Sequence, residues 1–224
     1  MRVPLLLAAC AATALAAPVV SHDKPSVDEA AVQARKLVRA ESLADLDTVF
    51  QSGDKAGSAI GLLEYYADCD DDGSLTLLMV EVGHTFKNWM EGSPVSFSIR
   101  QTRPAFSPAS QPRVALSGDL AFIEGDDAIE AAKVCFLHRH PDAHAWLPGN
   151  KIHATAFMKF NVESVYWLGG FGNVAFIGDI PTDLYTSATL PRMRFPHPSV
   201  PGHGRHNEDD DEDEEEEHEE QEEH

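Results

Sequence analysis

Basic residues are scarce in this sequence: 17 Lys and Arg stand against 37 Asp and Glu, for a formal net charge of −20. Proteins that bind nucleic acids carry clustered Lys and Arg that neutralise phosphates, so the composition excludes that class of partner. Long apolar runs are missing as well, because no stretch reaches the roughly 20 apolar residues that a membrane-spanning helix requires. The sequence therefore predicts no nucleic-acid partner and no membrane span.

Cysteine is nearly absent, with three residues in the chain. Cys10 lies in the apolar N-terminal segment, which leaves Cys69 and Cys135 for the folded part. In an oxidising compartment these two could form a disulfide or remain free thiols, and their distance cannot be read from the sequence. Asn-x-Ser/Thr sequons are missing too, so N-glycosylation is not expected.

The N-terminus has the three parts of a secretory signal peptide. Arg2 supplies a positive charge, an apolar segment runs from Val3 to Leu15, and small residues surround a cleavage point near Ala16. We therefore expect residues 1–16 to be a signal peptide. The mature protein is expected to be secreted to the extracellular space, or to reach the vacuolar or another endomembrane lumen.

The C-terminus is strongly acidic. Fourteen carboxylates lie between Glu208 and Glu223, interrupted only by His218 and Gln221. Such a run repels itself and has nothing to bury, so residues 208–224 are expected to form a disordered acidic tail. A linker rich in Pro, Gly and His precedes it over residues 191–207. Without the tail's acids the balance is 17 basic against 23 acidic residues, so the folded part is only mildly acidic.

The apolar pattern of residues 17–190 is typical of a mainly β domain. Ser26 and Glu29 form a capping-box signature before a helix that should end near Ala40, and Gly118 marks a candidate β-bulge. Apolar or alternating runs predict strands over 46–51, 59–66, 75–82, 95–100, 114–123, 153–168 and 174–177. Further helices are expected from about 84 and over 127–138. Strands outnumber helices and do not alternate with them, which favours one β-barrel with peripheral helices over an α/β fold.

Three local patterns resemble ligand motifs and are interpreted otherwise. Asp68, Asp70 and Asp72 begin like a calcium loop, but Met79 stands where the twelfth-position Glu would be needed, which favours a solvated turn. The spacing of His138, His140 and His144 does not place all three on one helix face. Gly170 and Gly172 lack the third glycine and the βαβ unit of a dinucleotide site. No metal site is therefore predicted.

The most informative stretch runs from Leu75 to Arg100. A buried strand leads into a short helix near His84, where Thr85, Lys87 and Asn88 would cluster at the N-terminal end. Free backbone N–H groups with a hydroxyl, an amide and an ammonium could bind a phosphate there. Ordinary helix capping, with Lys87 in solvent, explains the same residues and is favoured on physical grounds alone.

Three segments together resemble a known superfamily. They read MVEVGHTFKNWMEGSPVSFSIR, then CFLHRHPDAHAWLPGN, then NVESVYWLGGFGNVAFIG. The set resembles the pyridoxamine-5′-phosphate-oxidase-like, FMN-binding split-barrel superfamily, and within it the CREG-type branch in its fungal-like form. Haem-utilisation proteins are similar in the same segments. The resemblance covers about Ala30 to Tyr185.

The resemblance implies a six-stranded split β-barrel that forms a homodimer. In flavin-binding relatives FMN lies at the dimer interface, and its phosphate is held at the end of the third strand and the following helix. Here that site would comprise Thr85, Lys87 and Asn88, with Arg100 as a further phosphate contact. By the same analogy Met79, Val80 and Glu81 would lie beside the flavin ring.

CREG-type members are generally regarded as having lost flavin binding and enzymatic activity. We therefore expect a non-enzymatic protein without a bound cofactor, acting through contacts with an unidentified protein partner. The alternative is an FMN-dependent oxidoreductase, with haem handling as a more distant one. The loop from Thr102 to Pro112 is a candidate filler of the flavin site. Tyr166, Trp167 and Phe171 are candidates for a dimer surface and equally for the core.

Overall fold

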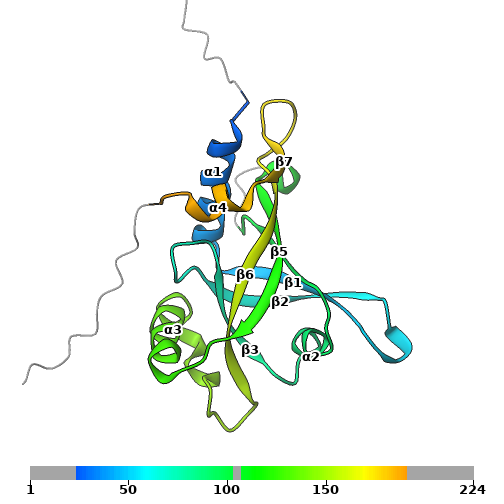
Figure 1. Cartoon of the computed structure of the whole chain (residues 1–224), viewed down its shortest axis with the longest axis vertical. Helices are drawn as coiled ribbons and strands as arrows, with labels where there is room; N and C mark the ends of the chain where they lie inside the picture. Colours follow the sequence, from blue (N-terminus) through cyan, green and yellow to red (C-terminus); the bar gives the residue numbers. More distant parts are fainter. Residues whose placement is uncertain (1–23, 103–106, 191–224) are drawn as a thin grey trace, which may run out of the picture. The chain divides into compact units, whose positions relative to one another are not determined.

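The structure, a computed structural model, describes residues 24–102 and 107–190. The predicted signal peptide (1–16), the linker (191–207) and the acidic tail (208–224) lie outside these residues. Part of the predicted Thr102–Pro112 loop is outside them as well. The described part contains one antiparallel barrel with helices around it (Figure 1).

Seven strands and four α-helices make up this unit. The strands are β1 (Leu43–Val49), β2 (Ala59–Ala67), β3 (Leu75–Val80), β4 (Val95–Arg100), β5 (Arg113–Phe122), β6 (Thr155–Leu168) and β7 (Ile177–Ile180). The α-helices are α1 (Val27–Ala40), α2 (His84–Met90), α3 (Asp126–Arg139) and α4 (Thr182–Ser187). Short 3-10 turns are η1 (Gly53–Lys55), η2 (Pro108–Ser110) and η3 (Pro141–Trp146).

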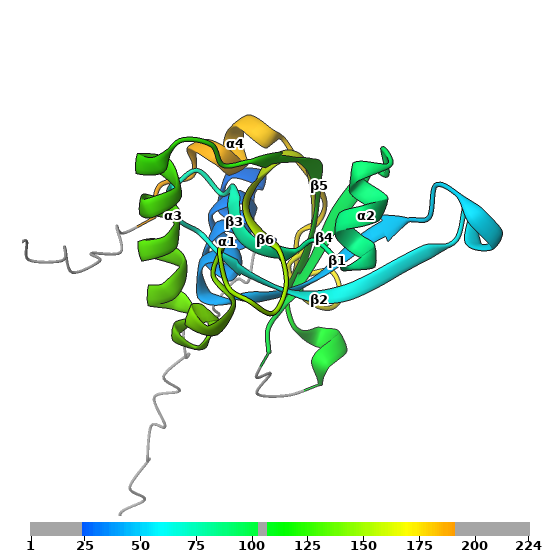
Figure 2. The same ribbon diagram turned by 90° about the horizontal axis from the view of Figure 1, so that it is seen from below.

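Six of the strands close into a barrel, which confirms the predicted split-barrel fold. The sheet order is β3-β2-β1-β4-β5-β6-β7, and an added β3–β6 pairing joins its first strand to its sixth. β7 therefore lies outside the ring, paired only with β6. Figure 2 shows the strands curving around the barrel interior. β2 and β3 pair only through Tyr66–Leu77 and Ala67–Thr76, so these two strands diverge beyond Tyr66.

The barrel interior is filled by side chains that alternate along each strand, because successive residues of a strand point to opposite faces. Leu46, Phe97, Leu116 and Phe160 are among the fully buried residues. The predicted bulge is confirmed: the β5–β6 register shifts between Ser117 and Gly118. A Cβ at Gly118 would approach the Asn161 carbonyl oxygen to 1.9 Å, so the close strand contact requires glycine there.

Helix α1 forms as the sequence predicts. Ser26 and Glu29 make both hydrogen bonds of a capping box, and the helix ends at Ala40. Its apolar face joins the barrel core through Ala30, Ala34 and Val38. In Figures 1 and 2 α2 and α3 lie on opposite sides of the barrel. No helix in the described ranges is long and apolar enough to cross a membrane.

Two strands were predicted with wrong bounds, and one helix was missed. The first strand begins at Leu43, because Ala44 and Leu46 both point into the interior and alternate with the less buried Leu43 and Asp45. The last strand is Ile177–Ile180, since the preceding Ala175 packs inside the turn after β6. Helix α4 was not predicted; it has only six residues and gives little periodic signal.

Candidate functional site

The predicted phosphate site falls on α2, which directly follows β3. Gly83 is its N-cap and provides no side-chain hydrogen bond. The helix has seven residues and turns three side chains inwards, Thr85, Phe86 and Asn88, while Lys87 is exposed. Two of the four predicted site residues are therefore buried among other parts of the chain.

Thr85 is held by a carboxylate. Its Oγ1 donates to Oε1 of Glu64 on β2 at 3.1 Å, and Thr85 is 2% exposed. Burial raises the pKa of the Glu64 carboxyl above its ordinary value, and the hydrogen bond from Thr85 partly opposes this rise. A hydroxyl that would donate to a cofactor phosphate thus donates to an internal acid, whose negative charge repels phosphate.

Asn88 ties α2 to the neighbouring strand. Its Nδ2 donates to Oγ1 of Thr48 at 3.0 Å, and both residues are buried. Ser93, just beyond the helix, accepts from the Val49 amide at 2.8 Å. These bonds position α2 over β1 and satisfy polar groups that would otherwise be buried without partners. The Asn88 side chain therefore stabilises the packing of α2 on the barrel.

Arg100 lies at the other end of β4. It forms an ion pair with Asp45 on β1. Thr48, which binds Asn88, is also on β1, but it follows Asp47, the residue opposite Ser96 near the start of β4. Five residues along a strand span about 17 Å. Arg100 therefore does not join the residues of α2 within one chain.

These four residues do not fit a single FMN-phosphate cradle in one chain. Thr85 and Asn88 have internal partners, the exposed Arg100 is paired with Asp45 elsewhere, and Lys87 is exposed on α2. Sequence reasoning missed Glu64, because its contact with Thr85 depends on how α2 folds back over β2. Flavin binding stays a prediction, now without a preformed anion site on α2.

The three residues expected beside a flavin ring differ in how deeply they are buried. Met79 is 1% exposed and belongs to the barrel core. Val80 and Glu81 are half-buried, and the Glu81 amide donates to the Ala154 carbonyl at 3.0 Å. Of the dimer candidates, Trp167 is a core residue at 1% exposure, whereas Tyr166 and Phe171 are exposed.

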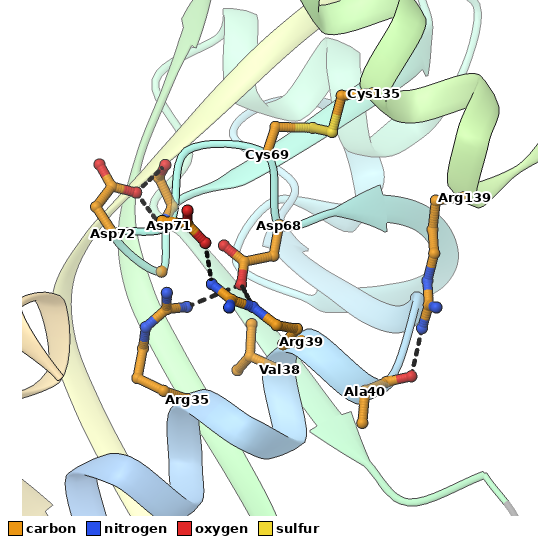
Figure 3. A network of polar contacts seen from close by, with 12 residues as sticks. Arg35, Val38, Arg39, Ala40, Asp68, Cys69, Asp71, Asp72, Cys135 and Arg139 are labelled. Carbon is orange, nitrogen blue, oxygen red and sulfur yellow. Dashed lines mark hydrogen bonds and ion pairs between the residues drawn. A yellow bond between two sulfur atoms is a disulfide. The ribbon is translucent and has the colours of Figure 1, made fainter. Parts of the chain in front are cut away.

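The acidic turn after β2 is not simply solvated. Asp68 is buried and accepts from Nη1 of Arg35 at 3.2 Å and Nε of Arg39 at 2.9 Å, and Arg39 also pairs with Asp71. Figure 3 shows both arginines of α1 pointing into this turn. The sequence showed the four aspartates, but the arginines that neutralise them come from a helix about thirty residues away in the chain.

A disulfide joins the same turn to α3. Cys69 and Cys135 are bonded, across a sequence separation of 66 residues, which resolves the alternative that the sequence left open. Arg139 of α3 also donates to the Ala40 carbonyl at the end of α1 (Figure 3). The turn and α3 therefore hold α1 against the barrel.

Within the histidine cluster, His140 has a structural role. His140 is buried, and its Nε2 donates to the Tyr66 carbonyl at 2.9 Å. Burial lowers the pKa of His140, against the raising effect of that hydrogen bond. No group of three or more His, Cys, Asp or Glu residues within the described ranges could hold a metal ion.

A family model described as "CREG, beta-barrel" matches residues 25–187. A heme binding protein from Mycobacterium smegmatis has a similar structure, with a TM-score of 0.60 and 21% identity over 73% of this chain and 61% of its own. The protein Atu2129 from Agrobacterium tumefaciens has a TM-score of 0.54 and 18% identity over 72% of this chain and 64% of its own.

This chain therefore spans less than two thirds of either solved neighbour. At these identities the two structures are evidence of a shared fold. No curated protein matches the sequence at a significant level.

Proposed function

The chain belongs to the CREG β-barrel family, and from this membership we propose that it is a secreted or endomembrane protein that acts through protein contacts and not as a flavoenzyme. One observation carries the proposal: the Thr85 hydroxyl is engaged by the Glu64 carboxylate at 3.1 Å. Relatives that bind FMN need that region to attract a phosphate. Here a negative group already occupies the position of the acceptor.

The Glu64 carboxylate would repel a phosphate bound at Thr85. A phosphate that reached Thr85 would lie about 5 Å from the Glu64 carboxylate, and like charges at that distance repel by roughly 3 kcal/mol at an effective dielectric constant of about 20. Lys87 supplies one compensating charge, but as a single exposed ammonium without the two-pronged geometry of arginine. The Glu64 charge therefore opposes a phosphate at Thr85, against one exposed ammonium at Lys87.

The variant Glu64→Gln tests directly whether the Glu64 charge opposes FMN binding. Glutamine keeps an oxygen that accepts from Thr85 but removes the charge, so the variant should bind FMN at least tenfold more tightly than the unmodified chain. Adding Lys87→Ala to Glu64→Gln should abolish the gain. Isothermal calorimetry with FMN measures both effects. If Glu64→Gln leaves FMN affinity unchanged, the Glu64 charge is not what opposes the phosphate.

We further propose that the protein forms a homodimer through the outer face of β2, β1, β4, β5 and β6. One row of directly opposed residues crosses these strands, namely Leu63, Asp45, Ser98, Ala115 and Tyr166. Its centre has short side chains, whereas Leu63 at one end is 58% exposed and Tyr166 at the other is 42% exposed. Exposed apolar groups at the two ends of the row are suited to contact with a second protein surface.

Charge on this face supports a second copy as the partner. Arg100 and Arg113 are opposed on β4 and β5 at one end of the face, where Arg100 pairs with Asp45 of its own chain and Arg113 adds a further positive charge. Asp47 lies towards the other end, opposite Ser96. A two-fold contact is self-complementary, so that residue i meets residue j and j meets i. The basic end of each copy can then face the acidic end of its partner.

Tyr166→Arg is expected to weaken this dimer by roughly tenfold or more, because it places a charge in an apolar contact. Sedimentation velocity over a concentration series measures the effect. Ile152→Arg, at a 68% exposed position outside the row, is the matched control and should leave association unchanged. A monomeric unmodified chain at all concentrations would contradict the dimer. A normal dimer of Tyr166→Arg would exclude this face.

A further inference from the structure

A second cluster of side chains lies on the other side of β2 from Glu64. Tyr65 follows Glu64 in the strand and points to the opposite face. Its ring stacks on His140 with centroids 4.4 Å apart, and Trp146 of η3 stands at 67° to it with centroids 6.0 Å apart. The Tyr65 hydroxyl donates to Oδ2 of Asp142 at 2.9 Å. We call Tyr65, His140, Asp142 and Trp146 the aromatic corner.

The aromatic corner is held in place by the fold. His140 is buried and hydrogen-bonded to the Tyr66 carbonyl, so it supports the Tyr65 ring from behind. Thr155 of β6 donates to the Trp146 carbonyl at 2.9 Å, and Ala143 anchors η3 in the interior. The rings therefore keep their positions without a ligand, which reduces the entropy cost of binding one.

The aromatic corner is also open to solvent. Tyr65 and Trp146 are each partly exposed, and Asp142 is exposed. Two π faces at a steep angle beside a carboxylate are the groups that recognise a methylated ammonium, because the ring faces and the carboxylate all attract positive charge. Methyl groups on the nitrogen reduce its hydration, so that it can leave water for an aromatic surface.

We propose that the aromatic corner binds a quaternary ammonium group, as carried by choline-like molecules. Trp146 and Tyr65 supply the π surfaces, and Asp142 supplies the counter-charge. An ammonium carried together with a phosphate is disfavoured, because the phosphate would meet Asp142. This site lies on the face of β2 opposite Glu64 and so is separate from the contact of Glu64 with α2. Tyr65 shares the outer face of β2 with Leu63, two residues away, so the aromatic corner borders one end of the proposed dimer face. The proposal rests on contacts within one chain.

Choline is the direct probe, with 3,3-dimethylbutan-1-ol as its uncharged counterpart of the same shape. Saturation-transfer NMR on the methyl protons of each compound, with the full chain, measures binding. We expect choline to bind with a dissociation constant on the order of 1 mM and the uncharged compound to bind at least tenfold more weakly. Phosphocholine, as a third probe, should also bind more weakly than choline.

Two variants assign the site. Trp146→Ala should lower choline affinity at least tenfold, and Asp142→Asn should lower it severalfold while its amide oxygen still accepts from Tyr65. Asp126→Asn removes a similar exposed charge from α3 and should change nothing. Equal binding of choline and the uncharged compound, no binding of choline, or choline affinity unchanged in both Trp146→Ala and Asp142→Asn would overturn the proposal. Asp142→Asn keeps the test valid if Trp146→Ala fails to fold.

Discussion

Replacing Cys69 and Cys135 together with serine is expected to lower the free energy of unfolding by about 4 kcal/mol, because the bond closes a 66-residue loop. A cross-link of that length restricts the unfolded chain strongly, and its removal restores that freedom. Chemical denaturation of the double variant and of the unmodified chain measures the difference. Both proteins should have the same circular dichroism before denaturation.

Reduction of the unmodified chain provides the matched control. In dithiothreitol the unmodified protein should become as unstable as the serine variant, and the variant itself should not respond to the reductant. A loss below about 1 kcal/mol would contradict the expectation, since it would mean that the unfolded chain is scarcely restrained by the bond. The disulfide also ties α3 to the turn that holds α1, so the loss should be accompanied by faster amide exchange in α1.

Asp68→Ala should destabilise the fold by roughly 3–5 kcal/mol, because it leaves a buried charge without its partner. The Arg35 side chain is fully buried and that of Asp68 is 1% exposed. Alanine removes the carboxylate that neutralises Arg35 and also accepts from Arg39. Thermal and denaturant unfolding at pH 7 measure the effect.

Asp71→Ala is the control for this prediction. Asp71 pairs with Arg39 in the same turn, but its side chain is half exposed, so its removal should cost less than about 1 kcal/mol. Similar losses in Asp68→Ala and Asp71→Ala would show that burial does not determine the strength of these pairs. Asp68→Ala and the cysteine replacements affect adjacent residues, so their effects should not simply add.

Local patterns in the sequence predicted much of the secondary structure. The Ser26–Glu29 capping box located α1, and the alternation of Val95, Phe97 and Ile99 with polar residues located β4 with its observed ends. Both signals depend on neighbours a few residues apart, where backbone geometry fixes which side chains share a face. Helix α4 has too few residues to give such a signal.

Contacts between distant segments could not be predicted in this way. The β3–β6 pairing that closes the barrel and the Cys69–Cys135 bond join residues more than sixty positions apart. The barrel itself was expected only because three sequence segments resemble a known superfamily. The hydrogen bond between Thr85 and Glu64 could not be predicted for the same reason. Glu64 is 21 residues away in the chain, and only the fold brings its carboxylate to the Thr85 hydroxyl.

Under the proposed function, the fold would keep the position of a binding site without its chemistry. The order of strand, turn and short helix is present, and Lys87 remains at the surface. The hydroxyl and amide beside it have become structural, through Glu64 and Thr48. We therefore attribute this arrangement of strand, turn and helix to packing and surface contacts, and place the proposed ligand chemistry at the aromatic corner.

Calorimetric titration of FMN into the unmodified full chain tests the central claim most directly. The account predicts no measurable binding at FMN concentrations up to about 100 µM, because the Glu64 charge at Thr85 opposes the phosphate. A dissociation constant at or below about 1 µM, which corresponds to roughly −8 kcal/mol, and its loss in Lys87→Ala would contradict the account. That result would assign α2 as a working phosphate site and the protein as a flavin-dependent one.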